Sequence, residues 1–343
     1  MGAPQRPTIK TVAARAGVGR TTVSRVVNGS DLVSDAAKAA VLAAIAELNY
    51  VPNSVARGLV TRRTNSIALV IPESESRLGA EPYFSAVIRG VSAALRDTRT
   101  QLQLVLVRDR EERDQLTAHV AERRVDGVLL VSVHQHDPLP DILENLGLPT
   151  VLAGRRSAEE SLSHACSDNL GGAKSAGRHL VDSGRTAIAT ITGPLDMDVS
   201  RSRLQGWKDA MDEAGMPPEN CPVATSDFTE EGGMAAMRSL LARSPKLDAV
   251  FAASDVMAAG AMLELRRQGR RIPEDVAVVG FDDSYIARYA HPSLTSVRQP
   301  VEEIGSTITR VLLEEIADPG SQRQKLVLPT ELIVRDSSSP CGS

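Results

Sequence analysis

A length of 343 residues, with 42% hydrophobic and 24% charged residues, is typical of a globular chain with room for two or three domains. Three cysteines (Cys166, Cys221 and Cys341) are too few for a disulfide framework, which argues against a disulfide scaffold. No apolar run approaches the roughly 20 residues that span a bilayer, which argues against an integral membrane protein. The net charge of −4 hides an asymmetry, because residues 1–63 carry +6 and the remainder carries −10.

This asymmetry predicts which end of the chain meets nucleic acid. A basic segment attracts phosphates, whereas the acidic remainder repels them. The first residues do not form an apolar segment ahead of a cleavage site, so we expect a cytoplasmic protein that reaches the nucleoid through DNA and makes no membrane contact. The alternative, a charge fluctuation on a solvated surface, loses weight once the motif below is considered.

Residues 8–28 contain the pattern of two short helices joined by a glycine turn. Apolar residues from Ile9 to Ala16 recur at a helical period behind Thr8, a candidate N-cap, and a second apolar run begins at Val18 after Gly17. This is the helix-turn-helix pattern, whose second helix enters the major groove of DNA. The outward face of that helix carries side chains that can bind phosphates or base edges: Arg20, Thr21, Thr22, Ser24 and Arg25. The alternative is a small helical hairpin with a solvated polar face.

A third helix and a short basic segment follow. Asn28 and the next glycine end the second helix, and Ser34 is a candidate N-cap for an Ala-rich helix that ends near Tyr50. A proline then blocks continuation, and residues 54–60 have room for about two helical turns, which is marginal for an isolated helix in water. Leu59 is apolar in a basic setting, as expected of a wedge inserted between base steps in the minor groove.

From residue 65 onward, short apolar runs alternate with helical patterns. The runs predict strands over residues 67–71, 102–107, 127–131, 150–153, 187–192, 249–253 and 276–281. The segments between them predict helices over residues 84–96, 114–123, 172–183, 201–214, 229–243 and 256–268. Such alternation is typical of βαβ units with parallel sheets. We therefore expect two α/β subdomains and a tail, with a helix over 301–317, that completes their sheets.

Polar side chains follow several of these strands directly, at the ends where ligands bind in parallel sheets. They are Glu73, Arg108, Asp109, Ser254, Asp255, Asp282 and Asp283. Carboxylates and a guanidinium that converge on one cleft can bind sugar hydroxyls in pairs, with an aromatic ring stacking on the sugar. The alternatives for each residue are a helix cap and a structural ion pair.

We find no pattern of a catalytic or metal site. Asp282 and Asp283 are adjacent, so their side chains are expected to diverge rather than act as a catalytic pair. His134 and His136 lack further ligands at metal-binding spacing, so a solvated loop is the simpler interpretation. The glycines match neither a phosphate loop nor a dinucleotide fingerprint, and we recognise no nucleophile elbow. We expect no catalysis, metal or cofactor.

Taken together, the motifs resemble those of the LacI family of bacterial transcription regulators. The matching segments are VAARAGVGRTTVSRVVNGS, VSDAAKAAVLAAIAELNYVPNSVARGL, DAVFAASDVMAAGAMLELRRQGRRIPEDVAVVGFDDS and PSLTSVRQP, so the resemblance covers essentially the whole chain. Within the family, five segments are most similar to the cellobiose-responsive repressors of actinobacteria: AGVGRTTVSRVVNGS, LVTRRT, AEPYF, VDGVLLVSVHQHDPLP and SDFTEEGGMAAMRSLL.

The resemblance implies an α/β chain in three parts. A helix-turn-helix DNA-binding headpiece over residues 1–52 is expected to join, through a hinge helix and linker over 53–64, a body over 65–343. That effector-binding and dimerisation domain is expected to have the two-subdomain fold of type I periplasmic binding proteins, with parallel sheets. Its N-subdomain is predicted at about 65–165 plus 295–328, and its C-subdomain at about 166–294 plus 329–343.

The resemblance also implies site residues. The expected DNA contacts are Thr8, Arg20, Thr21, Thr22, Ser24, Arg25, Asn28, Asn53, Ala56, Arg57 and Leu59. In the body, Arg203 matches the arginine that binds the effector in this family, and Phe228 matches the position of an aromatic residue that covers the effector. The full set expected around the effector is Glu73, Tyr83, Phe84, Arg108, Asp168, Arg203, Phe228, Ser254, Asp255, Asp282 and Gln299.

The function implied is repression of carbohydrate-utilisation genes. A homodimer would bind a palindromic operator, and a small saccharide, cellobiose or a cello-oligosaccharide, would close the cleft and release the DNA. Alternatives within this class are another sugar or a purine, and co-repression in place of induction. A solute-binding protein shares the body fold but needs no headpiece, and an enzyme with an appended regulatory domain needs a catalytic motif. The tail RDSSSPCGS has no leucine heptad, so we expect a dimer rather than a tetramer.

Overall fold

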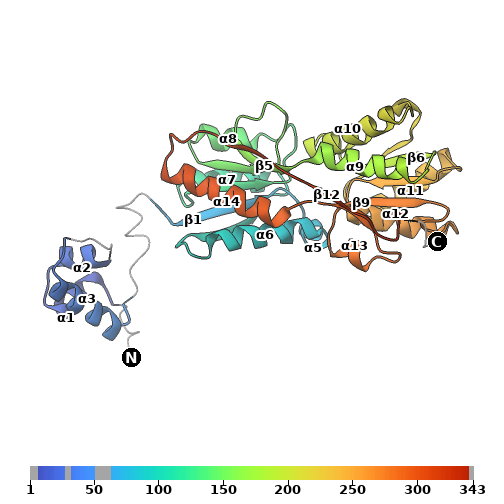
Figure 1. Cartoon of the computed structure of the whole chain (residues 1–343). Helices are drawn as coiled ribbons and strands as arrows, with labels where there is room; N and C mark the ends of the chain where they lie inside the picture. Colours follow the sequence, from blue (N-terminus) through green and yellow to red (C-terminus); the bar gives the residue numbers. More distant parts are fainter. Residues whose placement is uncertain (1–6, 28–31, 51–62, 340–343) are drawn as a thin grey trace. The chain divides into compact units, whose positions relative to one another are not determined.

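The computed structural model describes residues 7–27, 32–50 and 63–339. Contacts divide the chain into two compact units, Met1–Thr64 and Asn65–Ser343, and each unit is described by itself (Figure 1). Within the described ranges, no helix is both long enough and apolar enough to cross a membrane.

The first unit contains three helices, α1 (Ile9–Ala16), α2 (Arg20–Val27) and α3 (Asp35–Glu47). Thr8 caps α1 as predicted, because its hydroxyl accepts from the Thr11 amide while the Thr11 hydroxyl accepts from the Thr8 amide. Gly17 ends α1 at a φ of 68°, in the left-handed region that favours glycine. The apolar faces of the three helices enclose a core of Val12, Ala13, Val23, Val26, Val41 and Ala44. The helix-turn-helix prediction is thus confirmed.

The first half of the second unit contains a six-stranded parallel sheet of order β11-β5-β4-β3-β1-β2. Its strands are β1 (Ser66–Ile71), β2 (Gln101–Leu106), β3 (Gly127–Val131), β4 (Thr150–Ala153), β5 (Ser163–Ser167) and β11 (Lys325–Leu328). Strands β1, β3 and β4 are buried on both faces, which explains why their sequences form continuous apolar runs.

Helices cover both faces of this sheet. One face packs against α6 (Pro82–Leu95) and α14 (Val301–Ala317), and the other against α7 (Arg110–Ala121) and α8 (Leu139–Asn145). Successive residues of β1 alternate between these two cores, with Leu69 in the first and Val70 in the second. A short helix that the sequence did not predict, α5 (Glu75–Ala80), connects β1 to α6.

The second half contains another six-stranded sheet, of order β12-β10-β9-β8-β6-β7, in which only β12 pairs antiparallel. Its strands are β6 (Ile188–Thr192), β7 (Val223–Thr225), β8 (Ala249–Ala252), β9 (Ala277–Asp282), β10 (Thr295–Arg298) and β12 (Glu331–Ile333). Helices α9 (Asn169–Asp182) and α10 (Asp198–Glu213) cover one face, and α11 (Glu230–Arg243) and α12 (Asp255–Arg267) cover the other. The short α13 (Tyr285–Tyr289) follows β9.

The chain passes between the two halves three times: after β5, after β10, and between β11 and β12 (Figure 1). One boundary differs from our expectation. We predicted that residues from 295 onward belong to the first half, but β10 pairs with β9 in the second sheet. Thr295 and Ser296 are fully buried there, so the chain leaves this sheet only after Arg298. The fold class, a helical headpiece followed in the chain by an α/β body with parallel sheets, is as predicted.

Candidate effector cleft and DNA-reading surface

A cleft lies between the two halves of the body, beside the carboxyl ends of their parallel strands. It contains about 730 Å³ of space between protein atoms, its open mouth included. Seven of the predicted effector residues line it: Tyr83, Phe84, Arg203, Phe228, Ser254, Asp282 and Gln299.

Arg203, on α10, is held in one orientation by several partners. Its guanidinium donates to Asn169 Oδ1 at 2.9 Å and to the carbonyl oxygen of Ala253 at 2.6 Å. It also stacks on the Phe281 ring, with 3.7 Å between Cζ and the ring centroid. Burial lowers the pKa of Arg203, whereas the nearby Asp282 raises it. A guanidinium remains a cation under such opposing influences, so Arg203 is a fixed positive group in the cleft.

Asp282 ends β9 and faces Arg203, with 3.7 Å between the Arg203 Nη1 and Asp282 Oδ1 atoms. Its φ of 118° is unusual for a residue with a side chain. Gln299 donates to Asp282 Oδ1 at 2.6 Å and accepts from the Ser167 hydroxyl at 2.8 Å, so residues from both halves fix this carboxylate. Burial raises the pKa of Asp282 to about 6, and the charge of Arg203 opposes this rise.

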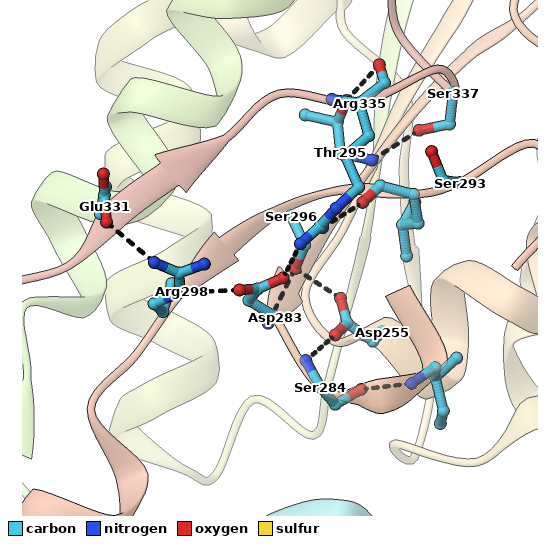
Figure 2. A network of polar contacts seen from close by, with 12 residues as sticks. Asp255, Asp283, Ser284, Ser293, Thr295, Ser296, Arg298, Glu331, Arg335 and Ser337 are labelled. Atoms are coloured by element: carbon cyan, nitrogen blue, oxygen red, sulfur yellow. Dashed lines mark hydrogen bonds and ion pairs between the residues drawn. The ribbon is translucent and has the colours of Figure 1, made fainter. Parts of the chain in front are cut away.

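Asp283, the next residue, does not line the cleft and belongs to a polar network on β9, β10 and the chain after β12 (Figure 2). It accepts from Arg298 at 2.7 Å and also pairs with Arg335, and Arg298 pairs in turn with Glu331 at 3.2 Å. The two adjacent aspartates therefore diverge, as predicted. Asp282 lines the cleft, whereas Asp283 is held by Arg298 and Arg335 away from it.

Asp255 is a correction to our prediction, because it does not line the cleft. Its carboxylate accepts from the Ser296 hydroxyl at 2.5 Å and from the Ser284 amide at 2.7 Å (Figure 2). The side chain is fully buried, and burial together with the charge of Asp282 raises its pKa. Asp255 therefore joins α12 to the β9–α13 turn and to β10, while its neighbour Ser254 caps α12 and reaches the cleft.

Phe228 enters the cleft from the loop before α11, on the second half of the body. It is buried and has a φ of 65°. Its ring packs so closely on Gly193 that a Cβ there would lie 2.2 Å from Phe228 Cζ. From the other half, Arg77 on α5 places its Cζ 5.5 Å from the ring centroid. This contact links the two sides of the cleft.

Arg77, on α5, belongs to an ion-pair triad that our sequence reasoning did not identify. Glu73 and Glu81 lie four residues before and after it and both pair with it, the second at 3.1 Å between Arg77 Nε and Glu81 Oε2. Glu73 also accepts from the Ser132 hydroxyl at 2.6 Å. The i,i+4 spacing of the three charges was the signal available in the sequence.

The pKa values of Glu81, a member of this triad, and of the nearby Tyr83 are both raised. Burial raises the pKa of Glu81 to about 7, with the charge of Arg77 acting against it and those of Asp282 and Glu73 adding to it. Burial and the charge of Glu81 also raise the pKa of the Tyr83 hydroxyl, which therefore stays protonated as a hydrogen-bond donor at neutral pH.

Three further predicted effector residues also lie away from the cleft lining. Glu73 is bound to Arg77 and Ser132 and does not line the cleft. Arg108 is half-exposed and pairs with Glu75 and Glu112. Asp168 caps α9 by accepting from the Gly171 amide at 2.8 Å. In each case the structural alternative, a cap or an ion pair, is the one that the chain adopts.

Further polar contacts join the two halves at the rim of the cleft. His134 Nδ1 lies 2.7 Å from Asp196, and the amide of the next residue, Gln135, donates to the Asp196 carbonyl. Arg155 pairs with Asp198 at 2.9 Å across the cleft. The histidine pair of our sequence analysis thus provides one interlobe contact, and within the described residues no group of three or more metal-ligating side chains is assembled.

The headpiece presents the predicted DNA-contacting residues of α2 on its surface. Arg20, Thr21 and Arg25 are exposed, whereas Thr22 and Ser24 are half-buried. The opposite face of α2 contributes Val23 and Val26 to the core, so packing fixes which side chains point outward. Five predicted DNA contacts lie outside the described residues: Asn28, Asn53, Ala56, Arg57 and Leu59.

Two protein-family models match the chain. Residues 8–53 match the model of bacterial regulatory proteins of the lacI family, and residues 178–338 match a periplasmic binding protein-like domain. These matches cover the headpiece and most of the second half of the body.

Similar proteins extend the match to nearly the whole chain. The HTH-type transcriptional regulator CelR of Thermobifida fusca is 49% identical over 97% of this chain and 98% of its own length. The ribose operon repressor of Escherichia coli K12 is 36% identical over 96% of this chain and 99% of its own. Among solved structures, a transcriptional regulator CelR–cellobiose complex is 47% identical with a TM-score of 0.78, covering 97% of this chain and 100% of that one. The lac repressor dimer bound to operator and the anti-inducer ONPF is 25% identical with a TM-score of 0.85, covering 97% and 99%.

Proposed function

This chain belongs to the LacI family of bacterial regulatory proteins, and on that premise we propose that it is a sugar-responsive repressor of transcription. It binds operator DNA through α2, and a small saccharide in the cleft of the body releases it. The observation that carries the proposal is 47% identity, over 97% of this chain, to a regulator whose solved structure is a cellobiose complex. The relatives are regulators of transcription, and this chain is a regulator rather than an enzyme.

The chemistry of the cleft supports a saccharide as the effector. Sugars have hydroxyls that donate to carboxylates and accept from guanidinium groups, and apolar ring faces that stack on aromatic side chains. Asp282, Arg203 and Phe228 provide these three kinds of partner within one cleft. We propose cellobiose or a short cello-oligosaccharide, with another sugar or a purine as the alternative.

Induction requires that the sugar favour a state that binds DNA poorly. We propose that the ligand tightens the cleft, shifts the two halves of the body, and thereby destabilises a short hinge helix between headpiece and body. The hinge residues, Leu59 among them, lie outside the described part of the chain. Co-repression, in which the ligand strengthens DNA binding, is the opposite sign of the same coupling.

We also propose a homodimer, which a palindromic operator requires by symmetry. Exposed aromatic side chains on the second half of the body support a contact surface. Tyr285 and Tyr289 of α13 are 53% and 84% exposed, beside a groove lined by Met262 and Ile286. Tyrosines are enriched in protein interfaces.

Fluorescence anisotropy on a labelled palindromic operator tests the function. Cellobiose is added to the protein–DNA complex, and maltose and guanine are added to matched samples. We expect cellobiose to lower the anisotropy to that of free DNA and the other two ligands to have little effect. Release by maltose or guanine alone would overturn the effector, and stronger DNA binding with cellobiose would overturn induction.

A further inference from the structure

The charged side chains that line the cleft are balanced. Among the described residues, three guanidinium groups and three carboxylates face this space, and they form three pairs. The nitrogen–oxygen distances are 3.1 Å for Arg77–Glu81, 2.9 Å for Arg155–Asp198 and 3.7 Å for Arg203–Asp282. Each cation of the lining therefore already has an anionic partner of its own.

The Arg77–Glu81 pair has a second carboxylate, Glu73, beside it, which gives this group of three an excess of negative charge. Arg77 lies between Glu81 and Glu73, and all three side chains are at most 15% exposed, so solvent screens them weakly. When both carboxylates are ionised, one guanidinium cannot neutralise them. The face of Arg77 that is left to the cleft contacts the Phe228 ring. An anionic ligand beside Phe228 would therefore meet repulsion from Glu81 without gaining a free cation.

The other two arginines of the lining, Arg203 and Arg155, are also occupied by partners within the protein. Arg203 already donates to Asn169 and to the Ala253 carbonyl, and Arg155 is held by Asp198. An uncharged ligand does not need a free cation, because its hydroxyls donate to carboxylate oxygens that remain accessible. The arrangement suits a neutral polyhydroxy compound and opposes an acid of the same shape.

We propose that Arg77 and Glu81 are specificity-determining residues that make the cleft accept an uncharged saccharide and reject its anionic derivatives, such as sugar phosphates and aldonic acids. This inference rests on the proposed function, because it refines the ligand class of the same cleft. Glu81 rejects the anion by repulsion, and it prevents Arg77 from acting as the counter-ion.

Calorimetric titration of the full chain with cellobiose and with its aldonic acid, cellobionate, tests this assignment. At about pH 8 Glu81 is ionised, and we expect the dissociation constant of cellobionate to be at least about tenfold higher than that of cellobiose. Glu81→Gln should lower this ratio of dissociation constants by roughly tenfold, because Arg77 then becomes available to the carboxylate of cellobionate. Arg77→Gln should widen the ratio of the two dissociation constants, because Glu73 and Glu81 then remain without the guanidinium that they share.

Glu75→Gln is the matched control, since it makes the same change within α5, the helix that Glu81 follows directly. Glu75 is 62% exposed and pairs with Arg108, away from the cleft lining, so its removal should leave the ratio unchanged. An unchanged ratio in Glu81→Gln, or an equal change in Glu75→Gln, with cellobiose still bound, would overturn this assignment alone. Failure of the unmodified chain to bind cellobiose would instead overturn the proposed function.

Discussion

Asp282 shows at the scale of one residue how a strand end becomes a binding group. The positive φ at Asp282 and Asp283 separates two adjacent carboxylates, one facing Arg203 and the other held by Arg298 and Arg335. Sequence position alone marked both residues as candidates. It could not say which would face the ligand, because that depends on arginines 15 and 52 residues away in the chain.

Changing either member of the Arg203–Asp282 pair should remove the response to sugar. We expect Arg203→Met and Asp282→Asn to bind cellobiose at least about tenfold more weakly, because each leaves a buried partner without its opposite charge. Operator affinity in the absence of sugar should stay close to that of the unmodified chain. The measurement is the sugar concentration that releases half of a labelled operator. Glu302→Gln, which breaks the exposed Arg89–Glu302 pair, is the control, and normal release by both test variants would show that the effector lies elsewhere.

The raised pKa of Glu81 predicts a pH dependence of stability. The folded chain holds the Glu81 proton up to a pKa of about 7, whereas an unfolded glutamate releases it near 4.5. The folded state therefore loses stability as pH rises from about 4.5 to 7, and the loss is complete above that window. Glu81→Gln cannot ionise, so its free energy of unfolding relative to the unmodified chain should rise by on the order of 3 kcal/mol across the window.

Urea unfolding of both proteins at several pH values measures this difference. Asp282 titrates in the same range in both proteins, so the comparison reports mainly on Glu81. Parallel stability curves from about pH 4 to 8 would contradict the assignment.

At the scale of the element, regular segments were predictable and short ones were not. Buried strands such as β3 and amphipathic helices such as α14 have strong periodic patterns, and their predicted bounds agree with the structure. Strand β5 was missed because its sequence, SHACS, is polar although all five residues are buried. Helix α5 was missed because six residues are too few for a periodic signal, and its position depends on Glu73 and Phe228.

The same distinction applies to the site. Family resemblance predicted cleft residues on long, regular elements, such as Arg203 on α10. Arg108 and Asp168 were assigned from strand ends or local alignment, and their side chains instead form an ion pair with Glu112 and the cap of α9. The sequence does not encode this choice locally, since a carboxylate at a strand end can cap the next helix equally well.

Helix α2 gives a prediction about DNA. Arg25 is exposed on the face opposite the headpiece core, where a guanidinium can bind a guanine edge in two places. If it reads a base, Arg25→Ala should weaken operator binding by about 1–3 kcal/mol and relax the preference at one position. Arg15→Ala is the control, because Arg15 lies on α1 and pairs with Glu47. Equal weakening on operator and random DNA would identify Arg25 as a phosphate contact.

At the scale of the molecule, dimer formation and the release of DNA by sugar depend on each other. A palindromic operator is bound by two headpieces, which only a dimer provides. Tyr289 is the most exposed large apolar side chain among the described residues. We expect Tyr289→Asp to shift the protein toward monomers at micromolar concentration and to weaken operator binding, while cellobiose binding in the cleft persists. Analytical ultracentrifugation measures the shift. Leu146→Asp, at another exposed apolar position, should remain dimeric, and a dimeric Tyr289→Asp would place the interface elsewhere.

The most direct measurement is calorimetric titration with cellobiose of the full chain, free and bound to a palindromic operator. Because coupling between two sites is reciprocal, a sugar that releases DNA must bind more weakly to the DNA-bound protein, by the same factor. We predict a weakening of at least about fivefold, the lower end of typical allosteric coupling. Equal affinity in the two states, or tighter binding on DNA, would contradict a repressor that sugar induces.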